Sequence, residues 1–261
     1  MKNIVLASVC LAVFAVSASA ADLPSRTRQP ATPVVAATPA FTWTGLYAGV
    51  NAGYGWSSGE KLSYRGDAAS LAYAGSGVYP TGLSSTRSGF VGGGQIGANY
   101  QMGQFVAGIE TDLMGIGSAK RVGYTLASGT NGSFKDAMGW LGTTRVRLGY
   151  TPVNRLLVYA TGGAAYGSTK HHGEIVAPSL GGARWFGRDS DTRFGWALGA
   201  GGEYAITNNL IARLEYLYYD LGRSNLALAA ANAPAVALGN TPLMRHENRG
   251  SIVRAGLNYK F

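Results

Sequence analysis

Cysteine is almost absent from the sequence, and none occurs after residue 20. No disulfide bond can therefore stabilise the rest of the chain. The single Cys10 lies within an apolar run, Ile4 to Val16, that follows Lys2 and precedes the small residues Ala18-Ser19-Ala20. A positive start, a short apolar run and an A-x-A site are typical of a secretory signal peptide. We predict that residues 1–20 are cleaved as a signal peptide and that the protein is exported.

Long hydrophobic runs and charged residues are also scarce. After residue 20 no apolar run approaches the ~20 residues that a transmembrane helix needs, and charged residues make up 13% of the sequence. Only helices and closed barrels can span lipid, so any membrane-spanning structure must be built from strands. Residues 21–40 contain four prolines and no apolar periodicity. We predict an extended periplasmic linker over 21–40 and a single domain over 41–261.

What the sequence does contain, from Phe41 onward, is a hydrophobic pattern with a period of two. Between Thr44 and Trp56 the even-numbered positions are apolar, and the odd-numbered positions are mostly small or polar. This alternation is the signature of a transmembrane β-strand. It recurs in seven further segments, at 88–101, 105–117, 137–150, 156–168, 192–206, 210–219 and 249–261.

Eight such strands predict an all-β fold, an eight-stranded antiparallel up-and-down transmembrane β-barrel. The connections between the strands alternate in length. Three are short, at 102–104, 151–155 and 207–209, and four are long, at about 57–87, 118–136, 169–191 and 221–248. We therefore expect short turns in the periplasm, four long loops outside the cell and both chain ends on the periplasmic side.

Charged residues occupy lumen-facing positions of the predicted strands. They are Glu110, Asp112, Arg145, Arg147, Glu203, Arg213, Glu215, Arg254 and Lys260. An eight-stranded barrel is only wide enough for side chains to fill it. We expect these charges to form a polar plug by pairing with one another or with trapped water. An ion-conducting lane is the alternative interpretation.

The histidines are the other candidate site. His171 and His172 are adjacent in a predicted loop, and adjacent histidines can ligate haem iron or a metal. No Cys or acidic cluster with metal spacing accompanies them, so we expect no metal site, and solvated loop residues are the simpler interpretation. Ser168 and His171 are the only close Ser/His pair, and they straddle a strand boundary. We expect no catalytic residue and no enzyme.

The basic excess suggests a partner. The formal net charge is +9. The basic residues of the predicted loops are Lys120, Arg121, Lys135, Arg184, Arg188, Arg223, Arg245 and Arg249. In an exported barrel such residues favour contact with anionic outer-membrane lipid, including lipopolysaccharide. Nucleic acid is not expected, because no nucleic-acid-binding motif is present.

Several stretches taken together resemble a known family. They are "WTGLYAGVNAGYGW", "GGGQIGANYQ", "RVRLGYTP", "YATGGAAYG", "LIARLEYLYYDLG" and "VRAGLNYKF". They look like the outer-membrane immunogenic proteins, which are small porin-like surface barrels of rhizobial-type alphaproteobacteria. The resemblance covers nearly the whole chain after the signal peptide, apart from the long loops.

The resemblance implies a place in the Gram-negative outer membrane and a structural, surface-exposed role in envelope integrity. Some members bind haemin, so haemin or a host surface is an alternative ligand for the loops, and a small diffusion channel is a further alternative. No other cofactor is expected. The resemblance also implies that Tyr259 and Phe261, at the inner aromatic girdle, form the terminal signal that outer-membrane assembly machinery recognises. Because the sequence ends on its last strand, we expect no peptidoglycan-binding domain of the kind that OmpA-type proteins carry.

Overall fold

The computed structural model describes residues 41–57, 60–65, 68–75, 83–85, 87–239 and 241–261. The predicted signal peptide and linker, residues 1–40, lie outside the described residues. Residues Phe41–Phe261 form one compact unit.

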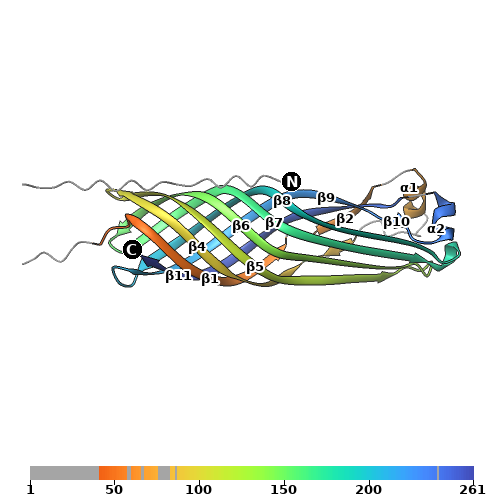
Figure 1. The fold of residues 1–261 in the computed structure, drawn as a ribbon, viewed down its shortest axis with the longest axis horizontal. Coiled ribbons are helices and arrows are strands. Elements are labelled where there is room, and N and C mark those ends of the chain that lie inside the picture. Colours follow the sequence, from red (N-terminus) through yellow and green to blue (C-terminus); the bar gives the residue numbers. More distant parts are fainter. Residues whose placement is uncertain (1–40, 58–59, 66–67, 76–82, 86, 240) are drawn as a thin grey trace, which may run out of the picture. The chain divides into compact units, whose positions relative to one another are not determined.

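Eight long antiparallel strands form a closed ring (Figure 1), in the order β1-β4-β5-β6-β7-β8-β9-β11, and the ring closes where β11 pairs with β1. Their bounds are β1 Gly45–Ser57, β4 Ser88–Met102, β5 Phe105–Thr125, β6 Asn131–Val153, β7 Leu156–Ala177, β8 Ala183–Ala205, β9 Leu210–Ala227 and β11 Leu243–Lys260. Each strand pairs with its neighbours around the ring, so the sheet closes on itself. The predicted eight-stranded up-and-down barrel is confirmed.

Short turns join the strands at one end of the ring, which we call the turn end. Residues 103–104 connect β4 to β5, 154–155 connect β6 to β7, and 206–209 connect β8 to β9. Gly103 has a φ of 61°, a left-handed conformation that glycine adopts without steric cost. These turns match the short connections that the sequence predicts.

The remaining elements lie in the connections at the opposite end, which we call the hairpin end. They are β2 Glu60–Arg65, α1 Ala68–Gly75, β3 Leu83–Ser85, the 3-10 helix η1 Pro178–Leu180, β10 Ala229–Ala230 and α2 Ala233–Leu238. In the described part of the chain, no helix combines the length and the apolar character needed to cross a membrane.

Two of the long connections differ from the prediction, because they are built largely as paired strand. β5 and β6 stay paired as far as Thr125 and Asn131, and β7 and β8 as far as Ala177 and Ala183. The four strands β5 to β8 contain between 21 and 23 residues each. A transmembrane strand needs about 9–11 residues. The predicted loops at 118–136 and 169–191 are therefore mainly hairpins that continue the barrel wall beyond the membrane-spanning length.

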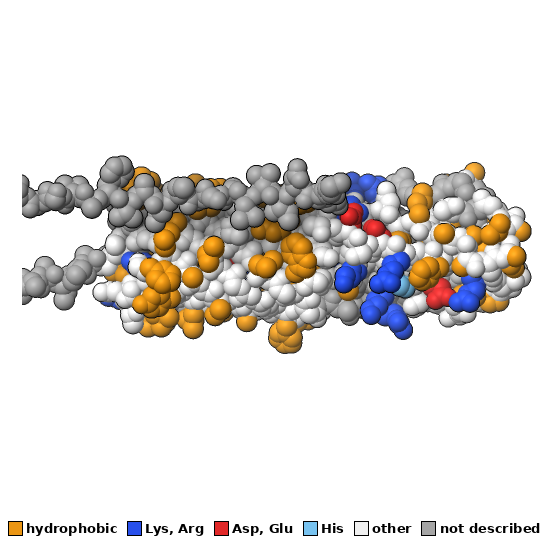
Figure 2. Space-filling model, in the orientation of Figure 1, with side chains coloured by type: hydrophobic (Ala, Val, Ile, Leu, Met, Phe, Trp, Pro, Cys, Tyr) orange, Lys and Arg blue, Asp and Glu red, His pale blue; other side chains and the backbone are white. Residues whose placement is uncertain are grey.

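The outer face of the ring carries an apolar band. Phe90 is 80% exposed, and Val50, Ile96 and Leu148 are also exposed. Figure 2 shows hydrophobic side chains spread along the ring, and Lys and Arg side chains gathered where the band ends. Large apolar side chains do not face water in such numbers on a soluble protein. The band has the form expected of a surface that faces lipid.

Aromatic side chains border the band at both ends. At the hairpin end Trp140, Tyr166 and Phe194 contact one another in sequence, and Trp196 contacts Tyr218. These five residues form the outer girdle. At the turn end Phe105 contacts Tyr150, and Tyr259 contacts Phe261. These four residues form the inner girdle. Aromatic girdles mark the two interfaces of a membrane barrel.

Side chains fill the interior of the ring in successive layers. The turn layer contains Trp43, Val106, Leu157, Tyr159, Ala205 and Ile211. The middle layer contains Val91, Met114, Met138, Leu141, Ala165, Ala197, Leu217, Tyr219, Leu221 and Ile252. The tip cluster, at the hairpin end, contains Phe134, Ile175, Ala177, Ala183, Trp185, Leu226, Leu228 and Ala235.

Candidate functional sites: the barrel interior and its outer face

Eight charged side chains meet inside the ring, between the turn layer and the middle layer. Each is at most 5% exposed, and together we call them the ionic cluster: Arg145, Arg147, Arg213, Arg254, Glu110, Asp112, Glu203 and Glu215. The strand register explains how they meet, because Glu110 lies directly opposite Arg145 on the neighbouring strand. Two further pairs of opposite sign face each other in the same way. With four arginines and four carboxylates, the charges balance, and pairing offsets the penalty for burying them.

Arg145 contacts three carboxylates of the cluster. Its terminal nitrogens lie 2.8 Å from Glu110, 2.6 Å from Asp112 and 3.0 Å from Glu215. Its Nε donates a hydrogen bond of 2.8 Å to Thr143. Because Glu215 belongs to β9 and Glu110 to β5, the Arg145 side chain bridges distant parts of the wall across the lumen.

The other arginines extend the network. Arg147 lies 2.9 Å from Glu203, and its guanidinium carbon lies 4.1 Å from the centre of the Tyr159 ring. Arg254 lies 3.0 Å from Asp112. A guanidinium in such a position forms ion pairs with the carboxylates through its N–H groups and a cation–π interaction with the aromatic ring through its flat face.

Glycines on the inner face make room for two tyrosines that support the cluster. A Cβ atom at Gly97 would collide with the ring of Tyr47, and one at Gly201 would collide with the ring of Tyr159. The Tyr47 hydroxyl donates to Glu110 at 2.6 Å and accepts from Arg147 at 2.7 Å. The high glycine content of these strands thus has a packing reason beyond strand flexibility.

Lys260 lies apart from the ionic cluster, although the sequence groups it with the other lumen residues. Its ammonium group donates to the backbone carbonyl of Thr42 and lies 4.8 Å from the centre of the Phe41 ring. The described ion pairs do not include it. Lys260 therefore occupies the turn end of the interior and contacts the segment that precedes β1.

The layers on either side of the ionic cluster leave little open space. Leu157 in the turn layer, and Met114 and Leu141 in the middle layer, have no exposed surface. A cavity beside Val91 and Tyr219 has a volume of about 20 Å³, which is room for about one water molecule. In the part of the chain that the structure describes, ionic and apolar side chains together occupy the barrel interior.

His171 and His172 lie on strand β7, which corrects the prediction that they occupy a loop. Successive side chains of a strand point to opposite faces. His171 is 1% exposed and lies 3.3 Å from the hydroxyl of Ser224. His172 is half-buried and packs edge-on against Phe186 at a ring distance of 5.0 Å. The two rings therefore do not converge on one ligand.

The same alternation separates Ser168 from His171. Ser168 follows Tyr166 and precedes Lys170 on the outward face of β7, whereas His171 points inward. The one Ser/His pair that the sequence offers is thus not brought together. Groups of three or more His, Cys, Asp and Glu side chains suited to a metal ion are absent among the described residues.

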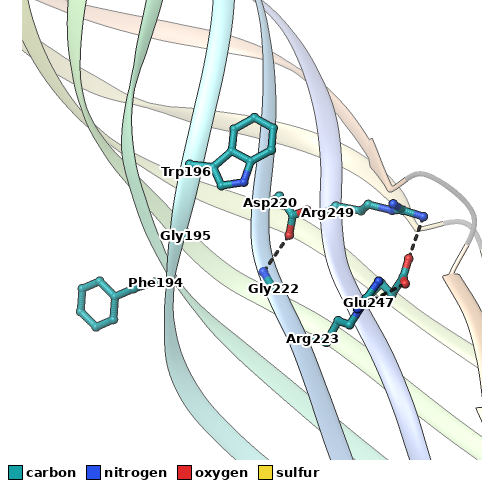
Figure 3. Close-up of a pocket in the computed structure, with 8 residues that line it drawn as sticks. All are labelled: Phe194, Gly195, Trp196, Asp220, Gly222, Arg223, Glu247 and Arg249. Atoms are coloured by element: carbon teal, nitrogen blue, oxygen red, sulfur yellow. Dashed lines mark hydrogen bonds and ion pairs between the residues drawn. The ribbon is translucent and has the colours of Figure 1, made fainter.

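A hollow of about 410 Å³ lies on the outer face between β8, β9 and β11 (Figure 3). The pairing of β8 with β9 reaches only as far as Trp196 and Asp220, and beyond that point the two strands separate. Arg249 lies 2.7 Å and Arg223 3.3 Å from oxygens of Glu247. The two arginines in this hollow therefore share one carboxylate.

A second group of cations lies on the outward face of β5 to β8, and it aligns three of the basic residues that the sequence assigns to loops. Arg121 is opposite Lys135, Lys135 is opposite His172, and His172 is opposite Arg188. Lys170 lies two residues from His172 on the same face. Arg121, Lys135, Lys170 and Arg188 are all exposed. We call these four cations the basic patch. The register of the extended hairpins brings its members together.

Comparisons with known proteins identify the family of this chain and proteins that resemble it. A family model described as outer membrane protein beta-barrel domain matches residues 7–261. The chain is 40% identical over 262 residues to the 31 kDa outer-membrane immunogenic protein of Brucella melitensis, with 100% of each chain covered. It is 29% identical to the 25 kDa outer-membrane immunogenic protein of Brucella abortus, with 100% of this chain and 99% of the relative covered. Among solved structures, the outer membrane protein OprG from Pseudomonas aeruginosa is 12% identical with a TM-score of 0.48, covering 84% of this chain and 96% of that one.

Proposed function

Because the chain belongs to the outer membrane protein beta-barrel family and is an outer-membrane protein, we propose that it is a structural, surface-exposed barrel with a closed interior. In this role it contributes to the integrity of the envelope. The observation that carries the proposal is the filled interior, in which the ionic cluster lies between two apolar layers. Eight strands enclose a space that side chains can fill, so the wall and its contents form one solid body in the membrane.

The proposal orients the barrel in the membrane. Short turns belong to the periplasmic side of such barrels and long connections to the outside. The turn end then faces the periplasm, and the hairpins of β5 to β8 project from the cell surface. The outward, charged side chains of these hairpins suit contact with water and with neighbouring surface molecules.

The inner girdle is a proposed contact for the assembly machinery. Phe261 is 73% exposed and packs against Tyr259 beside the closing strand β11. We expect Phe261→Ala to reduce the folded, heat-modifiable form in isolated outer membranes. Phe105→Ala is the matched control, because Phe105 is a 64% exposed aromatic of the same girdle on β5. Equal losses in the two variants would reduce Phe261 to an ordinary girdle residue.

Deletion of the gene tests the structural role. We expect deletion cells to become sensitive to detergent and to large antibiotics that an intact outer membrane excludes. Wild-type protein supplied from a plasmid should restore resistance. A second plasmid should encode an unrelated folded barrel at the same level, as a control for membrane occupancy. Unchanged sensitivity of the deletion strain would contradict the proposed role.

Haemin capture is the second candidate, and one observation favours it. His172 lies on the outward face between Lys135 and Arg188 and packs on Phe186. The histidine could ligate the haem iron, and the two cations could pair with the haem propionates. His172→Ala should then abolish the haemin absorbance shift and His171→Ala should leave it unchanged, because His171 is buried. A titration without any shift in the wild type would remove this candidate.

A further inference from the structure

We propose that the basic patch binds the phosphate groups of lipopolysaccharide in the outer leaflet. The patch consists of Arg121, Lys135, Lys170 and Arg188 on strands β5 to β8. The inference rests on the proposed orientation, in which the hairpin end lies outside the cell. It deepens that proposal by assigning the partner and the contact surface.

The cations of the basic patch lie side by side on neighbouring strands. Arg121, Lys135 and Arg188 share one row across four neighbouring strands, with His172 as the fourth position. Neighbouring strands lie ~4.8 Å apart, so the row spans about 14 Å. A row of this length runs across the barrel wall and offers several phosphate oxygens a cation on one continuous surface.

The four cations also lack an acidic partner in the described part of the barrel. Among the described side chains, no acid lies within ion-pair distance of any member of the patch. Nearby arginines differ, since Arg184 lies 2.6 Å from Glu174 and Arg249 lies 2.7 Å from Glu247. Like charges directly opposite each other destabilise a sheet, as Arg121 and Lys135 do here. An external anion between them would relieve that repulsion.

The basic patch lies just beyond the lipid-facing band, at the level where lipid headgroups are expected. Lys170 follows Tyr166 of the outer girdle by four residues on β7. At ~3.4 Å per residue and a strand tilt of ~40°, this places Lys170 about 10 Å beyond the girdle. Headgroups lie just beyond the hydrocarbon, where basic side chains contact anionic lipids. Figure 2 shows this gathering of Lys and Arg side chains beyond the hydrophobic band.

The location of the patch favours phosphate groups of a lipid over those of a soluble polyanion. The four cations lie on the lateral, outward face of the wall, continuous with the surface that faces lipid. A soluble polyanion would have to enter between the barrel and the outer leaflet to reach them. The hollow in Figure 3 is the weaker candidate, because its Arg223 and Arg249 already share Glu247.

The test measures binding of purified lipopolysaccharide to the folded full-length protein in neutral detergent micelles. We expect Lys135→Gln/Arg188→Gln to weaken binding by about 10- to 30-fold, and higher salt to weaken wild-type binding. Arg184→Gln/Arg223→Gln is the matched control, because it removes the same charge from arginines that are paired with acids. His172→Ala is a second control that keeps every cation of the patch. Both controls should bind almost as the wild type does.

Chemical removal of the phosphates from lipopolysaccharide should abolish the difference between the wild type and Lys135→Gln/Arg188→Gln. Heat-modifiable migration verifies folding, and Arg121→Gln/Lys170→Gln replaces the first variant if that one does not fold. Unchanged binding by the patch variants, or an equal loss in the arginine control, would overturn the proposal. Binding of heparin but not of lipopolysaccharide would also overturn it and assign the patch to a soluble polyanion. A negative result in the lipopolysaccharide-binding test does not change the phenotype expected of the gene deletion. The two proposals can therefore be refuted independently of each other.

Discussion

At the scale of single residues, Arg145 shows how the interior charges depend on one another. It contacts three carboxylates from two strands, all buried. Arg145→Ala would leave these acids short of a cation inside the barrel. We expect the free energy of unfolding to fall by about 3–5 kcal/mol, as measured by urea unfolding in lipid vesicles.

The control for Arg145 is its neighbour Val146, which is 63% exposed on the lipid-facing side. Val146→Ala should cost far less, because it removes no ion-pair partner. A double-mutant cycle of Arg145→Ala with Glu110→Gln should show coupling between the two residues. Additive effects in that cycle would mean that the ion pair does not exist in the folded barrel.

Gly97 carries a second prediction at this scale. A Cβ atom there would displace Tyr47, whose hydroxyl links Glu110 to Arg147. Gly97→Ala should therefore destabilise the barrel by about 1–3 kcal/mol through overpacking. Gly94→Ala on the same strand is the control, since its Cβ would meet only the Gly49 carbonyl at 3.5 Å. If both substitutions have equal effects in urea unfolding, the lumen contact is not the cause.

At the scale of elements, the hairpins of β5 to β8 share a separate hydrophobic core with the end of β9 and with α2. Trp185 is fully buried in the tip cluster with Ile175 and Leu228. Replacement of a core Trp by Ala costs about 3–5 kcal/mol. We expect Trp185→Ala to loosen the hairpin tip, so that trypsin cleaves after Arg184 or Arg188 on whole cells. The membrane-spanning ring should remain heat-modifiable.

Phe186→Ala is the control for the hairpin tip, because Phe186 is the next residue and is 43% exposed on the outward face. It should leave the tip resistant to trypsin. Rapid cleavage of the wild-type protein at the same sites would contradict a packed tip, whatever the variants do.

The hairpins also show where sequence reasoning succeeds and where it stops. Within the lipid-facing band, period-two alternation with apolar residues outward correctly predicts the number of strands, and the residues of the ionic cluster, which it assigns to the lumen, are buried. Beyond the band the alternation persists but reverses. Phe134 and Trp185 point inward, whereas Lys135 and Arg188 point outward. A prediction that requires apolar residues on the outward face therefore assigns these segments to loops.

The ionic cluster marks a second limit. The alternation indicates that Arg145 and Glu215 both face the lumen, yet 70 residues separate them in sequence. Their contact depends on the stagger of the strands around the ring, which is a property of the closed barrel. The sequence therefore predicts the members of the cluster, and the structure supplies their partners.

At the scale of the whole molecule, the turn layer, the ionic cluster and the middle layer lie one behind the other along the lumen. A solute would have to pass the turn layer, the ionic cluster and the middle layer, and each contains side chains with no exposed surface. Porins that conduct through an aqueous channel use 16–18 strands, and eight strands leave an interior that side chains fill. A diffusion-channel function is therefore disfavoured by the geometry, and a porin-like fold does not by itself imply transport.

Liposome swelling with a monosaccharide tests the closed interior most directly. Purified protein is incorporated into liposomes, and its folded state is verified by heat-modifiable migration. We predict that these liposomes swell no faster than protein-free liposomes, because the ionic and apolar layers leave no path for a sugar. A conducting porin in parallel liposomes establishes that the assay detects entry. Rapid swelling that requires the folded protein would show an open lumen and contradict the closed-barrel account.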